Sequence, residues 1–264
     1  MNRPRKRFGQ HFLAPAWADK VVQAIAPSRD ERFLEIGPGP GALTARLAAR
    51  AGHVTAIEID RDLAATLEPQ LPRNAEIVVA DILDVDLTPF LAAGPIRVAG
   101  NLPYNISSPI LFKLLAAAKA SPAIVDATVM LQLEVAERLV ASPRTRDYGV
   151  LTIFTAVQAD VTRLLTLPPG AFRPAPKVHS AVVRLTFKPS LIPPGQEGIF
   201  EGMVRTMFMQ RRKTLLNALR PFADAAGRSA GEALAAADID PIRRPETLTQ
   251  ADLLRLASVL AHEP

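Results

Sequence analysis

The chain has 264 residues, of which 48% are hydrophobic and 22% are charged. This composition is ordinary for a globular protein with a core, and it excludes a disordered or collagen-like chain. There is no Cys, so disulfides, thiolate nucleophiles and cysteine-held metal sites are excluded. The 31 basic and 26 acidic side chains leave a formal net charge of +5.

Much of the positive charge lies in a short N-terminal arm, residues 1–10, where Arg3, Arg5, Lys6 and Arg7 precede the first acid. No apolar stretch of signal-peptide or membrane-helix length follows the arm, so we expect a soluble, cytoplasmic protein. A solvated tail would explain the arm alone. Further basic clusters later in the chain favour a surface that binds nucleic acid. These clusters are Arg144/Arg146, Arg173/Lys177, Arg211-Arg212-Lys213 and Arg243-Arg244.

Short apolar runs alternate with helical spacing between residues 30 and 140. Strands are expected at 32–36, 53–59, 75–80, 96–100 and 125–131, and helices at 42–51, 61–68, 108–118 and 132–140. Strands that alternate with helices through short links form parallel sheets with right-handed crossovers. The pattern therefore predicts a doubly wound, Rossmann-like α/β fold.

The later segments are less regular. Residues 148–158 are expected to be helical, and strands at 161–167 and 180–187 could pair as an antiparallel hairpin at the edge of the sheet. Prolines and a glycine interrupt the stretch 188–196, which indicates a boundary near 188–198. Beyond it, four helices are expected at 199–209, 212–221, 230–237 and 250–261, the last capped by Thr249. We therefore expect a catalytic domain over 1–190 and a small all-helical domain over 191–264.

Acidic residues follow three successive strands. Gly37-Pro38-Gly39-Pro40-Gly41 turns directly after the first strand, and Glu35 stands just before the turn. Glu58 ends the second strand, roughly 20 residues past the first glycine, where an acid accepts both ribose hydroxyls in NAD and S-adenosylmethionine folds. Asp81 follows the third strand, where it can accept from an adenine amino group. The pattern predicts a nucleoside-containing cofactor at the carboxyl edge of the sheet.

The fourth strand leads into Asn101-Leu102-Pro103-Tyr104. These residue types also form ordinary turns. As a chemical set, the Asn101 side chain and the Leu102 carbonyl can accept hydrogen bonds from an exocyclic amine, Pro103 stiffens the backbone, and Tyr104 offers a face to a base. Rate would come from aligning the amine nitrogen with a methyl–sulfonium bond and from replacing water by fixed protein dipoles.

Together these motifs resemble the ribosomal RNA adenine N6-dimethyltransferase family. The resemblance covers nearly the whole chain and has two branches: a small-subunit enzyme (KsgA type) and an antibiotic-resistance enzyme that modifies large-subunit rRNA (Erm type). Leu102, the run 210–217 and the run 238–246 favour the KsgA type. The motifs that carry the family resemblance are Gly9–Leu13, Glu35–Gly41, Asn101–Tyr104 and the Pro169–Ser180 run.

The resemblance implies S-adenosylmethionine as methyl donor and dimethylation of two adjacent adenines in the 3′-terminal hairpin of small-subunit (16S) rRNA, within an immature subunit. It implies that Phe172 stacks on the target base opposite Tyr104, and that the helical domain recognises RNA. His11 stands where many relatives have Asn. The cofactor contacts carried over are His11, Leu13, Gly37, Glu58, Asp81 and Asn101.

We expect no metal site, because the remaining histidines show no ligand spacing. We also expect a monomer. Three alternatives stay open: an Erm-type enzyme, a non-catalytic ribosome assembly factor of the same fold, and an NAD-dependent dehydrogenase. The Gly-x-Gly-x-Gly spacing counts against the dehydrogenase. The complete Asn101–Tyr104 motif counts against lost catalysis.

Overall fold

A computed structural model describes residues 10–262. The basic arm at Arg3, Arg5, Lys6 and Arg7 lies outside these residues. Two compact units are present, one made of residues up to 136 together with 159–187, and the other of 137–158 together with 188 onward. We call them the sheet unit and the helical unit. Within residues 10–262, no helix is long and apolar enough to cross a membrane.

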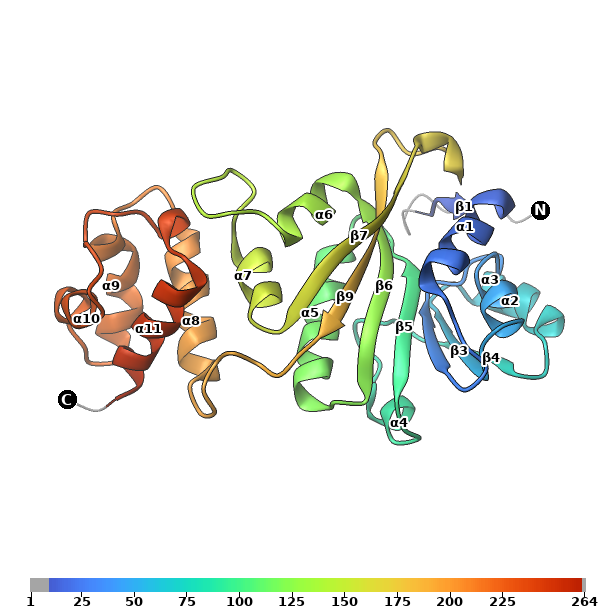
Figure 1. Cartoon of the computed structure of the whole chain (residues 1–264), viewed down its shortest axis with the longest axis horizontal. Coiled ribbons are helices and arrows are strands. Elements are labelled where there is room, and N and C mark those ends of the chain that lie inside the picture. Colours follow the sequence, from blue (N-terminus) through green and yellow to red (C-terminus); the bar gives the residue numbers. More distant parts are fainter. Residues whose placement is uncertain (1–9, 263–264) are drawn as a thin grey trace. The chain divides into compact units, whose positions relative to one another are not determined.

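The sheet unit contains a seven-stranded sheet in the order β4-β3-β2-β5-β6-β9-β7 (Figure 1). Its first five members pair in parallel, as predicted. β9 pairs antiparallel with both β6 and β7, so the predicted edge hairpin is confirmed. The strands are β2 (Arg32–Ile36), β3 (His53–Glu58), β4 (Ala75–Val79), β5 (Ile96–Asn101), β6 (Ile124–Gln132), β7 (Ala159–Leu167) and β9 (Ser180–Phe187).

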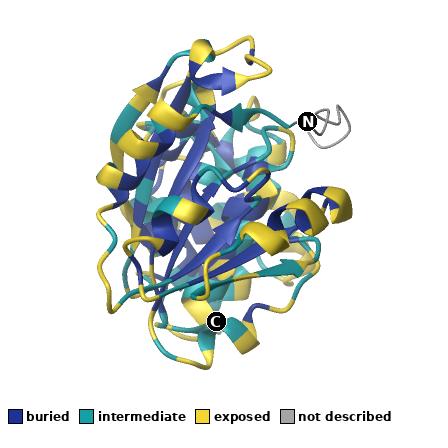
Figure 2. Cartoon of the chain, turned by 90° about the vertical axis from the view of Figure 1, so that its right-hand side faces the viewer, coloured by how far each residue is buried: buried dark blue, intermediate teal, exposed yellow. Residues whose placement is uncertain are grey.

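Helices lie on both sides of this sheet, and its central strands are buried, as Figure 2 shows. Burial on both faces explains why β2, β3 and β5 are continuous apolar runs rather than alternating ones. One core cluster packs α1 and α2 against the sheet. The helices of this unit are α1 (Pro15–Ile25), α2 (Thr44–Ala48), α3 (Arg61–Leu67), α4 (Thr88–Leu91), α5 (Ser107–Ala120) and the start of α6 (Leu133–Leu139).

A second, two-stranded pairing joins distant parts of the sequence. β1 (Phe12–Leu13) pairs antiparallel with β8 (Phe172–Arg173), which follows the short helix η3 (Pro169–Ala171). This pairing was not predicted, because two residues are too few to show a period. It brings the segment after the basic arm next to the start of the Pro169–Ser180 run.

The helical unit consists of α7 (Val150–Ala156), α8 (Glu197–Met209), α9 (Leu215–Ala225), α10 (Ala230–Ala236), η4 (Pro245–Thr247) and α11 (Gln250–Ala261). The predicted cap of α11 is confirmed, because the Thr249 side chain accepts from the Asp252 N–H. α9 differs from the expected 212–221: it starts after Arg211-Arg212-Lys213, which lie in a loop, and continues past Pro221.

The helical unit also takes in residues 137–158, which the predicted boundary assigned to the catalytic domain. Aromatic packing explains this difference. The Phe154 ring of α7 lies 6.2 Å from the Phe200 ring of α8, and the buried Tyr148 hydroxyl donates to the Leu248 carbonyl at 2.8 Å. Those partners lie far along the sequence, so local periodicity gives no sign of them.

Candidate cofactor and base-binding site

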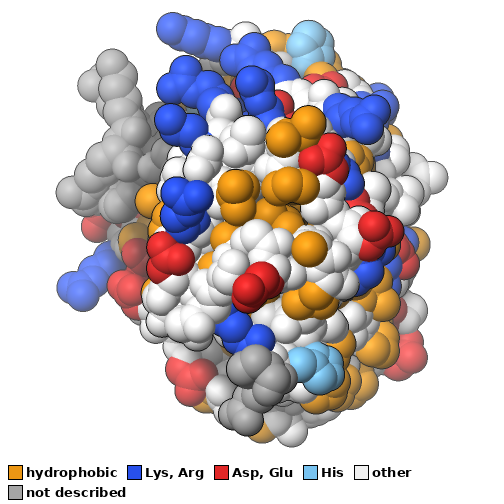
Figure 3. Space-filling model, turned by 90° about the vertical axis from the view of Figure 1, so that its left-hand side faces the viewer, with side chains coloured by type: hydrophobic (Ala, Val, Ile, Leu, Met, Phe, Trp, Pro, Cys, Tyr) orange, Lys and Arg blue, Asp and Glu red, His pale blue; other side chains and the backbone are white. Residues whose placement is uncertain are grey.

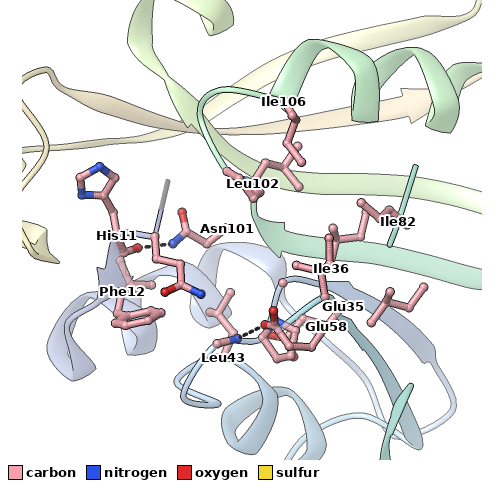
Figure 4. A pocket seen from close by; sticks show the side chains of 18 of the residues that line it. His11, Phe12, Glu35, Ile36, Leu43, Glu58, Ile82, Asn101, Leu102 and Ile106 are labelled. Carbon is pink, nitrogen blue, oxygen red and sulfur yellow. Dashed lines mark hydrogen bonds between the residues drawn. The ribbon is translucent and has the colours of Figure 1, made fainter. Parts of the chain in front are cut away.

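A cavity opens at the carboxyl ends of β2, β3 and β5 and is lined in addition by the segment around β1 (Figure 4). It lies wholly within the sheet unit. This is the edge at which doubly wound sheets bind ligands. Nine of the residues singled out from the sequence line it: His11, Leu13, Gly37, Glu58, Asp81, Asn101, Leu102, Pro103 and Tyr104.

The glycine turn after β2 forms one wall of the cavity. Gly37 and Gly39 have φ angles of +68° and +56°, which side chains with a Cβ rarely adopt. A Cβ on Gly39 would lie 3.1 Å from the Phe12 ring. The Gly37 N–H donates to the Ile57 carbonyl at 2.9 Å, which ties the turn to β3. The glycines therefore let bare backbone approach whatever occupies the cavity.

Glu58 is held by the turn it faces. Its Oε2 accepts from the Gly39 N–H at 3.0 Å, and its Oε1 accepts from the Asp60 N–H at 2.9 Å. Burial raises the pKa of Glu58, while these backbone hydrogen bonds oppose the rise. Each carboxylate oxygen has a further lone pair, so the side chain can also accept from two neighbouring hydroxyls. This arrangement suits the ribose contact expected from the sequence.

Asp81 also lines the cavity and follows the end of β4. Its Oδ1 accepts from the Leu83 N–H at 2.8 Å, which fixes the carboxylate at the start of the loop after β4. Ile59 and Ile82 also line this part of the cavity. The isoleucine side chains suit the flat face of an adenine ring, and the carboxylate suits its amino group.

Asn101 is oriented by a backbone carbonyl. Its Nδ2 donates to the His11 carbonyl at 2.6 Å, a contact drawn in Figure 4. Because a carbonyl oxygen can only accept, the amide nitrogen must face His11 and Oδ1 must face the other way. Oδ1 is buried and makes no hydrogen bond with any described residue. Asn101 therefore presents an unused acceptor in the site, which is what an exocyclic amine needs.

Tyr104 lines the same cavity, and two contacts fix its side chain. Its hydroxyl hydrogen-bonds with the Ser180 hydroxyl, and its ring stacks on His11 with centroids 5.2 Å apart and planes 25° apart. His11 Nδ1 donates to the Pro174 carbonyl at 2.7 Å. Burial raises the pKa of the Tyr104 hydroxyl, and the Ser180 contact opposes the rise. Ser180 and Pro174 were noticed in the sequence only as part of a motif, with no role assigned.

Phe172 is not brought into the cavity. Its side chain is 0% exposed and belongs to the core cluster with Leu13 and α1. The β1–β8 register, which pairs Phe172 with Leu13, places it there. In this structure, His11 and not Phe172 is the ring that stacks on Tyr104. Stacking of Phe172 on a target base stays a prediction.

Three loops of the helical unit meet and carry basic side chains. Arg211 donates to Glu246 at 2.9 Å and to the Arg146 carbonyl at 3.2 Å, and the Arg144 N–H donates to the Glu246 carbonyl at 2.7 Å. Arg211 thus holds the loops together. Lys and Arg side chains gather near the upper margin of Figure 3. The exposed members of this basic cluster are Arg144, Arg146, Arg212, Lys213 and Arg244.

The described residues include no group of three or more His, Asp or Glu side chains placed to hold a metal ion. The donor set at the cavity instead consists of the Glu58 carboxylate, bare glycine backbone and the unused Asn101 oxygen. These groups fit a cofactor with ribose hydroxyls and an adjacent amine substrate.

Known proteins were compared with this chain. Residues 1–261 match the family described as ribosomal RNA adenine dimethylase. A "Ribosomal RNA small subunit methyltransferase A" of Xanthomonas euvesicatoria is 46% identical, with 97% of this chain and 95% of that protein covered. One of the same name from Chromohalobacter salexigens is 44% identical, with 98% and 94% covered.

Two solved structures are similar as well. A dimethyladenosine transferase from Plasmodium falciparum has a TM-score of 0.74 and 25% identity, with 93% of this chain and 96% of that chain covered. The 23S rRNA methyltransferase ErmE has a TM-score of 0.67 and 30% identity, with 95% of this chain and 100% of that chain covered.

Proposed function

Because the chain belongs to the ribosomal RNA adenine dimethylase family, we propose that it dimethylates the N6 amines of two adjacent adenines in small-subunit rRNA. The observation that carries this proposal is the Asn101 amide, whose orientation leaves Oδ1 as an unused acceptor beside Tyr104. Relatives named for the small subunit are 42–46% identical over nearly the whole chain, which supports this branch over the large-subunit one.

S-Adenosylmethionine is the methyl donor, and when bound it supplies a sulfonium methyl group to the attacking amine. Glu58 would hold the ribose hydroxyls, Asp81 the adenine amino group, and the Gly37–Gly41 turn would let the remainder lie against backbone. These residues fix the position of the donor, and the rate gain from such positioning is large.

The chain's own residues prepare the adenine amine. Asn101 Oδ1 and the Leu102 carbonyl accept the two N6 hydrogens, which draws the nitrogen lone pair out of conjugation with the ring. Tyr104 limits the tilt of the base because its hydroxyl is tied to Ser180. The target base must leave its stack to reach this site. No side-chain base is needed, since the methylated amine loses its proton to water.

We assign RNA recognition to the helical unit, on the basis of the basic cluster described above. Its exposed cations suit phosphate contacts, which fix register but read no sequence. We further propose that the protein acts as a monomer in the cytoplasm, on an immature small subunit.

The test uses methyl-labelled S-adenosylmethionine with two substrates, unmethylated small-subunit particles and naked large-subunit rRNA. Label recovered as N6,N6-dimethyladenosine at adjacent adenines of the small-subunit particle is the expected result. Label on the large-subunit RNA would move the protein to the resistance branch. Bound cofactor with label on neither would favour a non-catalytic assembly factor.

An Asn101→Ala variant tests the role of this side chain in the same assay. Removing one preorganised hydrogen-bond donor from an oxyanion hole lowers turnover by about 100- to 1,000-fold, and we expect a loss of the same order on removing the Asn101 acceptor. Turnover equal to that of the unmodified protein would contradict the role assigned to Asn101.

A further inference from the structure

Glu35, the penultimate residue of β2, is a buried acid to which the reaction described above gives no role. Its side chain is 1% exposed, yet the residue lines the cofactor cavity. Its Oε2 makes no hydrogen bond with any described residue. Buried carboxyl oxygens normally have a hydrogen-bond partner, and no described residue supplies one to Glu35 Oε2.

The charged groups around Glu35 are acidic. Burial raises the pKa of Glu35 to about 8, the Thr44 side chain opposes the rise, and the negative charge of Glu58 adds to it. The other titratable residues along the cavity are His11, Asp81 and Tyr104, and its described lining contains no Lys or Arg. The flanking strands place Ala56 and Ala99 beside Glu35 in the sheet register. Among the described residues that line the cavity, no cation therefore balances a Glu35 carboxylate.

We propose that Glu35 is a carboxylic acid in the cofactor-free protein at neutral pH and becomes a carboxylate when the cationic methionine part of S-adenosylmethionine enters the cavity. The inference rests on S-adenosylmethionine being the cofactor. The proton passes to the solvent, and the positive charge of the ligand replaces it. Binding is thereby coupled to the release of one proton.

This coupling has a direction. A ligand that favours the carboxylate lowers the pKa of Glu35, so the complex holds fewer protons than the free protein at pH values below about 8. The affinity for S-adenosylmethionine therefore rises with pH over that range, by at most tenfold per pH unit, and levels off near pH 8. Uncharged ligands of the same cavity gain nothing from the change.

Calorimetry on the full-length protein at pH 7.0 tests the proposal. S-Adenosylmethionine is titrated in two buffers that differ in ionisation enthalpy, and the difference in binding enthalpy gives the number of protons released. We expect close to one proton for the unmodified protein and close to none for Glu35→Gln. No release from the unmodified protein, or equal release from both proteins, would overturn the proposal. Equal release would place the proton on a group other than Glu35.

Two further variants keep the test decisive if Glu35→Gln does not fold. Thr44→Val preserves shape and removes the polar group that lowers the pKa of Glu35, so the pH at which affinity levels off should move upward. Asp81→Asn removes a different carboxylate from the same cavity and should weaken binding without changing the proton count. A levelling point unmoved by Thr44→Val, or moved as far by Asp81→Asn, would count against Glu35.

Ligand analogues identify the charge that Glu35 meets. 5′-Methylthioadenosine lacks the amino acid part and should bind without proton release. S-Adenosylhomocysteine keeps the ammonium but lacks the sulfonium charge. If S-adenosylhomocysteine releases as many protons as S-adenosylmethionine, Glu35 meets the ammonium group. If it releases fewer, the sulfonium charge contributes part of the proton release. Release with methylthioadenosine as large as with S-adenosylmethionine would refute the proposal.

Binding without proton release leaves the methylation proposal intact, whereas absent methyl transfer to RNA leaves this inference intact.

Discussion

Glu58 is the residue that we propose to hold the ribose of the cofactor. Both its oxygens are held by backbone N–H groups of the segment they face, so its position is set before a ligand enters. Glu58→Ala would remove the two charge-assisted contacts proposed to the ribose, each worth about 1.5–3 kcal/mol. We therefore expect affinity for S-adenosylmethionine to fall by more than about 100-fold, measured by calorimetry.

Glu76→Gln provides the matched control for Glu58. Glu76 is an acid on β4 that accepts from the Thr55 hydroxyl and lines no part of the cavity. Its replacement should leave cofactor affinity unchanged. An affinity for the Glu58→Ala protein within threefold of the unmodified one would refute the ribose assignment.

Glu35 also links stability to pH in the cofactor-free protein. Its pKa is about 8 in the folded chain against an ordinary value of 4.5, so the folded state holds more protons than the unfolded state between these values. Stability contributed by this proton is present below pH 4.5 and is lost as the pH rises toward 8, by at most about 1.4 kcal/mol per pH unit.

Glu35→Gln removes that loss. We expect the variant to gain stability relative to the unmodified protein as the pH is raised from 5.5 to 8, measured by urea unfolding without cofactor. Parallel stability curves for the two proteins would show that Glu35 does not titrate in this range.

At the scale of elements, the pairing of β1 with β8 explains why Phe172 is buried. Its ring packs in the core with Leu13 and α1. Phe172→Ala is expected to lower the free energy of unfolding by about 3–5 kcal/mol, measured by denaturant titration. A cost below 1 kcal/mol would contradict the core assignment.

Phe172→Leu separates packing from the predicted stacking on the target base. Leucine retains much of the packing volume but has no aromatic face. A folded Phe172→Leu protein with strongly reduced turnover and normal cofactor affinity would support stacking. Unchanged turnover would contradict it.

The central strands were predictable because burial on both faces leaves continuous apolar runs between turns, as in Phe33-Leu34 of β2. That Glu58 and Asp81 line one cavity was predictable from these strands, since both residues stand where parallel strands end; their contacts with a cofactor stay a prediction. The roles of His11 and Ser180 at Tyr104 were not predictable from spacing. They depend on the residue before β1 and the first residue of β9 meeting the loop after β5, which is a property of the tertiary fold.

At the scale of the whole molecule, the basic cluster of the helical unit divides into two kinds of side chain. Arg211 is paired with Glu246, whereas Arg212 and Lys213 are exposed. Arg212→Ala and Lys213→Ala should each weaken binding to small-subunit RNA uniformly and reduce the slope of log affinity against log salt by about 1. Cofactor affinity should not change.

Arg255→Ala is the matched control. It removes the same charge from a side chain that is paired with Asp252 in the helical unit. RNA affinity and salt slope should stay near those of the unmodified protein. Equal effects of all three variants would indicate a general response to net charge rather than a phosphate-binding surface.

The chain leaves the sheet unit within α6, returns at residue 159 and leaves again after residue 187. The helical unit is therefore encoded by two separate stretches of the gene. Recombination at a single point near residue 187 would combine α8 to α11 from one parent with α7 from the other, and Phe154 would face an unmatched Phe200. A functional exchange of the helical unit between relatives therefore requires both stretches to be exchanged together. This requirement favours inheritance of the helical unit and the sheet unit from the same parent.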